Sequence, residues 1–326
     1  MKALTLNGYD GIASLALKDV PAPEPRPGDV LIAVRAASVN PVDGKISQGY
    51  ARARMELKFP HVLGRDCSGV VAKVGAEVTA FKPGDEVYGV GDQARSGTHA
   101  QFVAIDAANV GRKPKSIDHA AAASLPVAAL SAYAGIVGTG QVKVGQKVLI
   151  HAGAGGVGSI AIQIAKHLGA TVATTAGPAN ADFVRGLGAD VVIDYTKTDF
   201  ATAIKDYDLV FDLMGGDVRY RSFAVLKPGG VITHISVPPM SQQPPRSDVT
   251  VKPAPVSYER RLLEQIAAWV DGGVIKPLVM TVVQFADAIK AYEQVMTGHA
   301  RGKIVLAMAA SPWGRRIACF SESISI

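Results

Sequence analysis

Cysteine is almost absent from this sequence, with Cys67 and Cys319 the only two among 326 residues. Two thiols cannot build the disulfide framework of a small secreted protein or a cysteine-rich zinc site. Seven histidines are present, but no two of them stand at the short spacing that is typical of metal ligands. The composition therefore predicts a protein without a bound metal that works in the reducing cytoplasm.

Long apolar runs and a strong excess of one charge are also lacking. No apolar run reaches the roughly 20 residues that cross a membrane, and the first residues, Met1 to Leu6, lack the long apolar region of a signal peptide. The net charge of +6 is scattered along the chain, which indicates a solvated surface rather than a nucleic-acid patch. We expect a cytoplasmic protein that binds neither a membrane nor nucleic acid.

Glycine is plentiful, and the stretch 147–175 places it in an informative pattern. The apolar run Val148–Ile150 predicts a strand that is buried on both faces. Three glycines follow in the spacing G-x-G-x-x-G: Gly153, Gly155 and Gly158. Apolar residues then recur every three or four positions, as on one face of a helix. A second strand-like run ends the stretch, which therefore reads as a strand, a glycine-rich turn, a helix and a strand.

Each part of this unit suits the pyrophosphate of a dinucleotide. The first glycine permits a tight turn, the second leaves space for the phosphates, and the third lets helix and strand approach closely. The start of the helix adds free N–H groups and the positive end of the helix dipole. We therefore predict a dinucleotide site rather than a merely structural turn. Its residues are Gly153, Gly155, Gly156, Val157 and Gly158.

The pattern of the chain changes twice. Residues 1–118 read as short strands broken by turns, residues 119–256 alternate strands and helices, and residues 257–308 form a short return segment, while residues 309–326 are expected to be a disordered tail. The alternation predicts an α/β fold with a doubly wound parallel sheet of the Rossmann type. Within it we expect helices at 118–124, 130–137, 180–187 and 217–226, a turn at 227–230, and strands at 191–194, 207–213, 231–236 and 248–252.

Six short motifs make the chain resemble a known superfamily. They are Asn40-Pro41-Val42-Asp43, Gly64-Arg65-Asp66, Val74-Gly75, the run 82–89, the run 154–158 and the run 298–303. Over about residues 1–308 the chain resembles the medium-chain dehydrogenase/reductase superfamily, and more narrowly its zinc-free quinone oxidoreductase and 2-alkenal reductase branch. The resemblance implies that residues 1–118 and 257–308 form a β-rich, GroES-like catalytic domain beside the Rossmann domain. It also implies a homodimer joined through a sheet edge, for which residues 248–252 are a candidate.

The chain departs from the zinc alcohol dehydrogenases of this superfamily. Those enzymes carry a cysteine near Asn40 and a histidine where this chain has Arg65 in Gly64-Arg65-Asp66. Their third ligand, another cysteine, is missing as well, as is the structural lobe with four cysteines. Catalytic zinc needs three protein ligands and an open fourth position. We therefore predict a reaction that needs no zinc.

The end of the second strand favours NADPH over NADH. An NAD enzyme usually carries Asp or Glu there to bind the ribose hydroxyl, whereas this chain has Thr174 and Thr175, which leave room for a 2′-phosphate. Similar enzymes place a tyrosine at Tyr195 against that phosphate, although an ordinary strand-end tyrosine is the alternative. Relatives often add Lys or Arg just after the strand, and here residues 177–180 contain neither. By resemblance, the remaining cofactor contacts are Met214, Gly215, Ile235, Ser236, Arg301 and Lys303.

The resemblance places three candidate catalytic residues, Asn40, Asp43 and Tyr50, near the nicotinamide. Hydride delivered to the β-carbon of an enone creates an enolate, so the site must stabilise an oxyanion and supply a proton. The Tyr50 phenol can do either, and water can supply the proton. The alternatives are that Asn40 only forms a turn and that Tyr50 only packs against the substrate.

We therefore predict an NADPH-dependent oxidoreductase that reduces quinones or α,β-unsaturated carbonyls (2-alkenals and enones) and needs no zinc. For a quinone, one-electron chemistry stays open. The first alternative is a 2-enoyl thioester reductase, whose carrier phosphates would need a basic groove, with Arg52, Arg54 and Lys58 as candidates. The second is a non-catalytic protein that binds NADPH in a structural or regulatory role.

Overall fold

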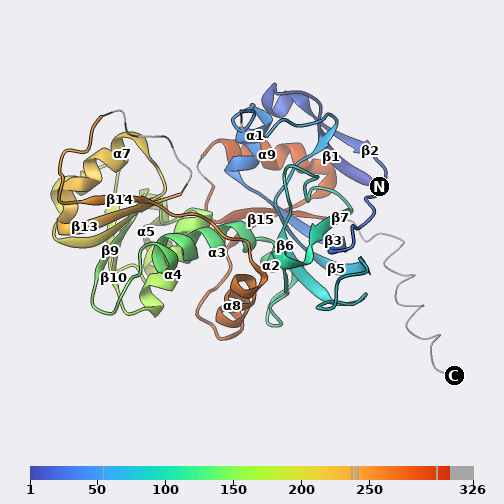
Figure 1. Cartoon of the computed structure of the whole chain (residues 1–326). Helices are drawn as coiled ribbons and strands as arrows, with labels where there is room; N and C mark the ends of the chain where they lie inside the picture. Colours follow the sequence, from blue (N-terminus) through green and yellow to red (C-terminus); the bar gives the residue numbers. More distant parts are fainter. Residues whose placement is uncertain (54, 236–237, 239, 241, 299, 309–326) are drawn as a thin grey trace. The chain divides into compact units, whose positions relative to one another are not determined.

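The computed structural model describes residues 1–308 except 54, 236–237, 239, 241 and 299. The chain divides into two compact units (Figure 1). The first holds Met1–Val127, Tyr258–Asp271 and the chain from Pro277 onward, and the second holds Ala128–Ser257 and Gly272–Lys276. Unlike the sequence-based division, this one places residues 119–127 in the first unit and residues 257 and 272–276 in the second. Across the described residues, no helix combines the length and the apolarity that a membrane crossing requires.

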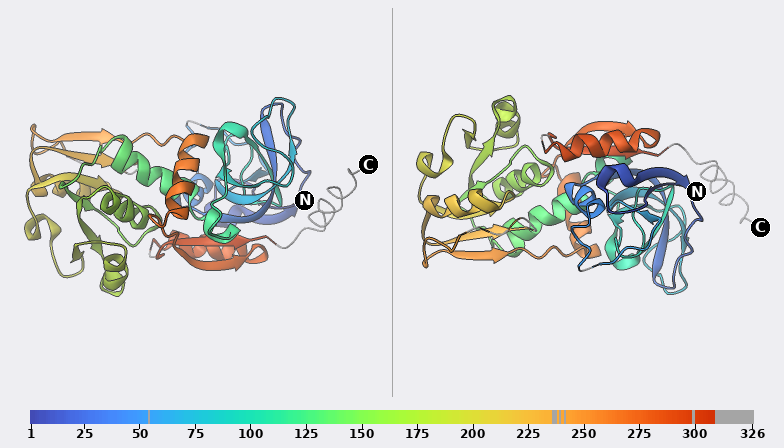
Figure 2. Two further views of the ribbon diagram at one scale, coloured as in Figure 1. Left: turned by 90° about the horizontal axis from the view of Figure 1, so that it is seen from below. Right: turned by 90° about the horizontal axis from the view of Figure 1, so that it is seen from above.

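Antiparallel strand pairs dominate the first unit. A small sheet has the order β2 (Leu15–Asp19), β1 (Lys2–Leu6) and β4 (His61–Val62). The larger sheet has the order β15 (Val279–Gln284), β16 (Lys303–Ala307), β3 (Asp29–Val39), β5 (Asp66–Val74), β6 (Glu86–Val90) and β8 (Val110–Arg112), and β7 (Phe102–Asp106) pairs with β3. The pairing of β16 with β3 brings the last described strand beside one of the first, as the red and blue ribbons show in Figures 1 and 2.

Two apolar clusters hold the first unit together. In one, Val30, Ile32 and Val34 point to the same face of β3 because side chains alternate along a strand. In the other, helix α9 (Ala288–Met296) buries the stripe Ala288, Ala291, Tyr292 and Val295, which has helical spacing. The remaining helices of this unit are α1 (Pro41–Ser47), α2 (His119–Ala123) and α8 (Arg260–Asp271).

The second unit is built on a parallel sheet of six strands. Its order is β11 (Val191–Asp194), β10 (Thr171–Ala176), β9 (Lys147–Ile150), β12 (Tyr207–Asp212), β13 (Leu226–His234) and β14 (Thr250–Pro253). The strand order reverses between β9 and β12, which is where sheets of this type bind ligands beyond their carboxyl ends. The helices between the strands are α4 (Gly156–His167), α5 (Ala181–Gly186), α6 (Phe200–Ala203) and α7 (Gly216–Arg221). The predicted doubly wound sheet is confirmed.

Several predicted boundaries change. The Lys-Pro-Gly-Gly segment at 227–230 lies inside β13 instead of forming a separate turn, and the register with β12 shifts there because Tyr207 pairs with Leu226 while Leu209 pairs with Val231. The helix expected at 217–226 is shorter and ends in a 3-10 turn, Ser222–Val225. The helix expected at 130–137 starts earlier, as α3 (Pro126–Tyr133), and continues as a π-helical turn. The predicted tail at 309–326 lies outside the described residues.

Candidate functional site

In the glycine-rich turn between β9 and α4, one glycine has free space where a side chain would stand, and two others are closely surrounded by neighbouring atoms. A Cβ on Gly153 would lie 2.0 Å from Thr174 Oγ1, and a Cβ on Gly158 would lie 2.3 Å from the carbonyl oxygen of Ala152. A Cβ on Gly155 would meet a single neighbour, at 3.4 Å. Gly155 is also the residue before the first turn of α4, where backbone N–H groups lack partners within the helix. The turn is therefore a cradle for an anionic group, and a nicotinamide dinucleotide fits it through its pyrophosphate.

Buried polar side chains hold this turn in place. The Thr175 hydroxyl accepts a hydrogen bond from the Ala152 N–H at 3.1 Å and donates to Nδ1 of His151 at 3.2 Å. His151 Nε2 then donates to the Ser222 hydroxyl at 2.9 Å. Burial lowers the pKa of His151 to about 4, so the ring is neutral. The Ser222 hydroxyl donates to the Val218 carbonyl at 2.7 Å and must therefore accept from Nε2, which assigns this tautomer. His151, which the motif alone did not single out, thus connects the turn to the helical segment after β12.

Two of the predicted cofactor residues, Thr174 and Thr175, use their hydroxyls inside the sheet, and their place beside a 2′-phosphate stays a prediction. Thr174 is fully buried and its hydroxyl donates to the Ile150 carbonyl at 2.7 Å. Thr175 is also buried, and its hydroxyl serves His151 and Ala152. Because threonines occupy these two positions, the end of β10 carries no carboxylate.

Tyr195 and Met214 have the exposure that cofactor contacts need. Tyr195 is 59% exposed, and its hydroxyl lies 3.4 Å from where a Cβ on Gly177 would stand, directly after β10. Met214 is 51% exposed and follows β12. Ile235 is half-buried at the end of β13, and Ser236 lies outside the described residues. Tyr195, Met214 and Ile235 follow β11, β12 and β13, at the carboxyl ends of strands of one parallel sheet, where ligands bind in such sheets.

A buried ion pair shapes the turn after β12. One oxygen of the Asp212 carboxylate accepts hydrogen bonds from the backbone N–H groups of Met214 and Gly215, both at 2.9 Å, and the other accepts from Arg219 Nε at 2.7 Å. Asp212 is fully buried, and Arg219 nearly so. Sequence reasoning missed both residues. The available signal was an aspartate at the carboxyl end of a predicted buried strand.

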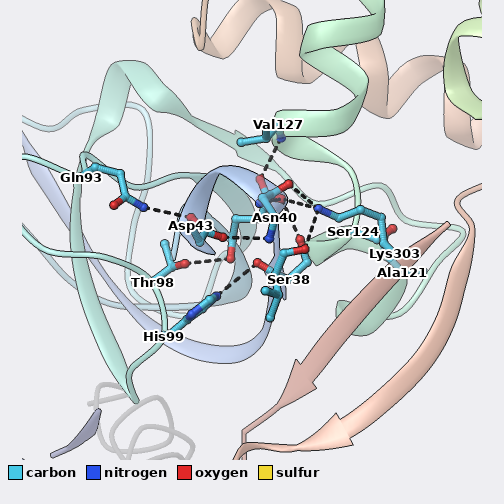
Figure 3. Close-up of polar contacts among 12 residues, drawn as sticks. Ser38, Asn40, Asp43, Gln93, Thr98, His99, Ala121, Ser124, Val127 and Lys303 are labelled. Atoms are coloured by element: carbon cyan, nitrogen blue, oxygen red, sulfur yellow. Dashed lines mark hydrogen bonds and ion pairs between the residues drawn. The ribbon is translucent and has the colours of Figure 1, made fainter. Parts of the chain in front are cut away.

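The first unit contains a second polar cluster, centred on Asp66 at the start of β5. One Asp66 oxygen accepts hydrogen bonds from Ser38 Oγ at 2.7 Å, Asn40 Nδ2 at 2.9 Å and Lys303 Nζ at 3.2 Å. The other accepts from the Val127 N–H at 2.8 Å. Figure 3 shows Lys303 directed toward Asn40 and Ser38 in this cluster. Four donors surround one buried carboxylate, which is how a buried charge is tolerated.

This cluster also includes Lys303, which is one of the predicted cofactor contacts. The Lys303 side chain is 7% exposed, and its ammonium donates to Asn40 Oδ1 at 2.5 Å, to Asp66, and to the Val39 carbonyl at 3.4 Å. An ammonium has three N–H donors, and these three acceptors use them, while a contact of Lys303 with the cofactor stays a prediction. Arg301 is exposed, and its backbone N–H contacts the sulfur of Met280 at 3.1 Å. Its cofactor contact stays a prediction.

Asn40 and Asp43 begin helix α1 and are themselves buried. They form a capping box, in which the Asp43 carboxylate accepts the Asn40 N–H at 2.8 Å. The second Asp43 oxygen accepts from Gln93 Nε2 at 3.2 Å. Burial raises the pKa of Asp43 to about 7, although the hydrogen bond from Asn40 opposes the rise. Both polar atoms of the Asn40 amide are occupied, by Lys303 and by Asp66. Asn40 and Asp43 therefore position helix α1, which precedes Tyr50.

Tyr50 is the exposed member of the predicted catalytic set. It follows α1 in a turn that contains Gly49 at φ +81°, and its N–H donates to the Lys45 carbonyl at 3.0 Å. The side chain is 62% exposed, with Lys45 Nζ 5.9 Å from the ring centre. The phenol is therefore accessible to a substrate, while Asn40 and Asp43 are not. Its catalytic role stays a prediction.

Two family models match the chain: the alcohol dehydrogenase GroES-like domain over residues 26–115 and the zinc-binding dehydrogenases over residues 187–306. The chain is similar to the chloroplastic NADPH-dependent alkenal/one oxidoreductase of Arabidopsis thaliana, with 37% identity over 317 residues covering 94% of this chain and 79% of the relative. It is 34% identical over 325 residues to the mitochondrial NAD(P)H oxidoreductase RTN4IP1 of Danio rerio, covering 86% and 84%. The quinone oxidoreductase structure from Coxiella burnetii matches with a TM-score of 0.87 and 33% identity, covering 95% and 99%.

Proposed function

This chain belongs to the medium-chain dehydrogenase/reductase superfamily, in the branch of quinone oxidoreductases and alkenal reductases, and from that premise we propose that it reduces α,β-unsaturated carbonyls or quinones with NADPH. It is an oxidoreductase, and its cofactor is a nicotinamide dinucleotide. The proposal concerns the substrate class, the choice of NADPH over NADH and the independence from metal.

The observation that supports the dinucleotide site, on which the whole proposal depends, is the open position at Gly155. A side chain there would meet one atom at 3.4 Å, whereas the two flanking glycines are closed by the fold itself. The residues that would hold a dinucleotide are Gly155, Gly156, Val157 and the turn after β12. The nicotinamide, when bound, supplies the hydride. NADPH is favoured because the end of β10 carries no carboxylate and the exposed Tyr195 stands beside Gly177.

The first unit offers the groups that the acceptor needs. When hydride reaches the β-carbon of an enone, negative charge moves to the carbonyl oxygen and a proton must reach the α-carbon. The exposed hydroxyl of Tyr50 can donate a hydrogen bond to that oxygen or a proton to that carbon. Asn40 and Asp43 act as positioning residues, because their capping box starts the helix that leads to Tyr50.

The donor set favours a reaction without a metal. In the part of the chain that the structure describes, no three His, Cys, Asp or Glu side chains gather where they could hold an ion. The buried Asp66 is neutralised by Lys303, and Arg65 beside it brings a second positive charge that opposes a bound cation. In this proposal, hydrogen bonds stabilise the developing oxyanion.

The test measures initial rates of cofactor oxidation by the purified protein with a chelator present. A 2-alkenal and a quinone are assayed separately, each with NADPH and with NADH. We expect turnover of at least one acceptor, and kcat/KM about 10-fold or more higher with NADPH, on the order of one charge-assisted hydrogen bond. Tight NADPH binding without turnover of either acceptor would contradict the proposal and favour the thioester or non-catalytic alternatives. Activity lost only with the chelator would contradict metal independence.

Three partner and location predictions join this proposal. β14 is an edge strand of the six-stranded sheet, so its backbone can pair with a second copy of the chain. On that basis we propose a homodimer. Separately, we propose a cytoplasmic location and no binding to nucleic acid or membranes. For the thioester alternative, the Arg52 guanidinium lies 5.3 Å from the Tyr9 ring centre, and Arg54 lies outside the described residues.

A further inference from the structure

Arg65 is a half-buried arginine that forms no ion pair with another described residue. It lies between Gly64 and Asp66, directly before β5. The carbon of its guanidinium stands 4.6 Å from the ring centre of Tyr258, in a cation–π contact. Its Nε is buried and has no hydrogen-bond partner among the described residues. A guanidinium is permanently charged and offers five N–H donors, so a half-buried one is normally matched by a carboxylate or another acceptor.

A second unpartnered polar atom lies on the segment beside Arg65. The Arg65 carbonyl accepts the Gly91 N–H at 2.7 Å, which holds the chain around residues 91–93 against it. Gln93 is 7% exposed and donates from Nε2 to Asp43, but its Oε1 is buried without a partner in the described part of the chain. The charge of Arg65 also reaches Asp43, where it is one of the influences that limit the rise in pKa caused by burial.

We propose that Arg65 is an oxyanion-binding residue of the substrate site, whose guanidinium donates hydrogen bonds to the carbonyl oxygen of the acceptor. The inference rests on the proposed function. As hydride adds to the β-carbon, the electron pair of the carbon–carbon double bond moves toward that oxygen, and a proton from Tyr50 or water then reaches the α-carbon. Arg65 itself neither gains nor loses a proton. It stabilises charge as a metal would, because a fixed cation in a partly desolvated site acts strongly on a developing oxyanion.

The arrangement around Arg65 suits this role better than a structural one. Two other arginines of the first unit form ion pairs: Arg95 pairs with Asp29 at 2.5 Å, and Arg112 pairs with Asp85 at 3.2 Å. Arg112 also stacks on an aromatic ring, with its guanidinium 5.7 Å from the centre of Phe81. Stacking is therefore shared by Arg65 and Arg112, while a buried Nε without an acceptor among the described residues distinguishes Arg65 from Arg112. An unpaired charge lowers stability, and such a feature is common where a ligand completes the site.

The test compares Arg65→Met with Arg112→Met, which removes a stacked but paired arginine. The probe is 4-nitrophenolate, an oxyanion that is not reduced, and its binding is followed by the change in its absorbance. We expect Arg65→Met to weaken binding about 10-fold or more, as for one charge-assisted hydrogen bond, and Arg112→Met to bind as the wild type does. Equal binding by the wild type and Arg65→Met would overturn the proposal, whatever the activity.

Kinetic and stability measurements complete the test. With a 2-alkenal, Arg65→Met should lower kcat roughly 100-fold, a loss typical of an oxyanion donor, with an unchanged Kd for NADPH and an unfolding midpoint that is unchanged or higher. Guanidinium ion at low concentration should restore part of the rate of Arg65→Ala, which a structural role would not allow. A wild-type rate in Arg65→Met would overturn the proposal. If the wild type binds the phenolate through Arg65 but reduces neither acceptor, the proposed function fails and the anion site stands.

Discussion

At the scale of single residues, two buried aspartates of the first unit have different surroundings. Asp66 receives hydrogen bonds from the Ser38 hydroxyl, the Asn40 amide, the Lys303 ammonium and one backbone N–H. Among the described residues, Asp43 receives hydrogen bonds from the Asn40 N–H and the amide of Gln93, and it faces the charge of Asp66 as well. Burial therefore dominates at Asp43 and raises its pKa from 3.8 to about 7. Asp43 is thus the carboxyl group through which pH affects this cluster.

The raised pKa of Asp43 predicts how Asp43→Asn changes stability with pH. Between pH 3.8 and about 7 the folded protein retains a proton that the unfolded chain has released, so the contribution of Asp43 to the free energy of unfolding falls as the pH rises through this window. Asparagine lacks this titration, and Gln93 can turn its unpartnered Oε1 toward the new amide. The free energy of unfolding of the variant minus that of the wild type should increase by up to about 1.4 kcal/mol per pH unit. Denaturant titrations at several pH values measure it, and a constant difference would contradict the account.

The residues of the two polar clusters were only partly predictable. Asn40 and Asp43 stand three positions apart in a motif, so their pairing at the start of a helix is a local property. Lys303 contacts Asn40 from 263 positions away in the sequence and Asp66 from 237 positions away. No periodicity connects such distant positions. The motif that contains Lys303 therefore suggested a cofactor contact, whereas the fold uses its charge to neutralise Asp66.

At the scale of elements, the glycine-rich turn must allow close packing of strands and helix at two glycines and must stay open at a third. Gly153 and Gly158 lie where β9, β10 and α4 pack closely, and Gly155 lies where the turn is open. The spacing of the motif predicts all three glycines because strand, turn and helix are consecutive in the chain. It does not reveal Thr175 and His151, which hold the turn through hydrogen bonds across the sheet. The bulge of β13 at 227–230 was missed for a similar reason, since it depends on pairing with β12.

Alanine should affect NADPH binding at the open glycine and stability at the closely packed one. Gly155 has φ −76°, which alanine adopts without strain, so Gly155→Ala should leave the unfolding midpoint nearly unchanged and weaken NADPH binding about 10-fold by obstructing the pyrophosphate. In Gly158→Ala the new Cβ would stand 2.3 Å from the Ala152 carbonyl oxygen, so the variant should lose about 1–3 kcal/mol of stability. Calorimetric titration and thermal unfolding measure both effects. Wild-type affinity in Gly155→Ala would exclude this turn as the seat of the phosphates.

At the scale of the whole molecule, the chain has two units with separate tasks. The second unit supplies the dinucleotide cradle at the carboxyl ends of a parallel sheet, and the first supplies the exposed Tyr50 and the half-buried Arg65. The sequence predicted the doubly wound sheet because helices and strands alternate along it. It did not predict β15, β2 or the short helix α1, whose apolar patterns are too brief to recognise without their packing partners.

The central claim, that hydride passes to the carbon–carbon double bond of an unsaturated carbonyl without a metal, is tested most directly by isotope transfer. The protein is incubated in a chelator with a 2-alkenal and NADPH carrying deuterium at C4, in separate samples labelled on each face of the ring. The account predicts a saturated aldehyde with deuterium on its β-carbon from one of the two labelled cofactors, as read by NMR. Deuterium on the carbonyl carbon of an allylic alcohol, or no transfer at all, would contradict it.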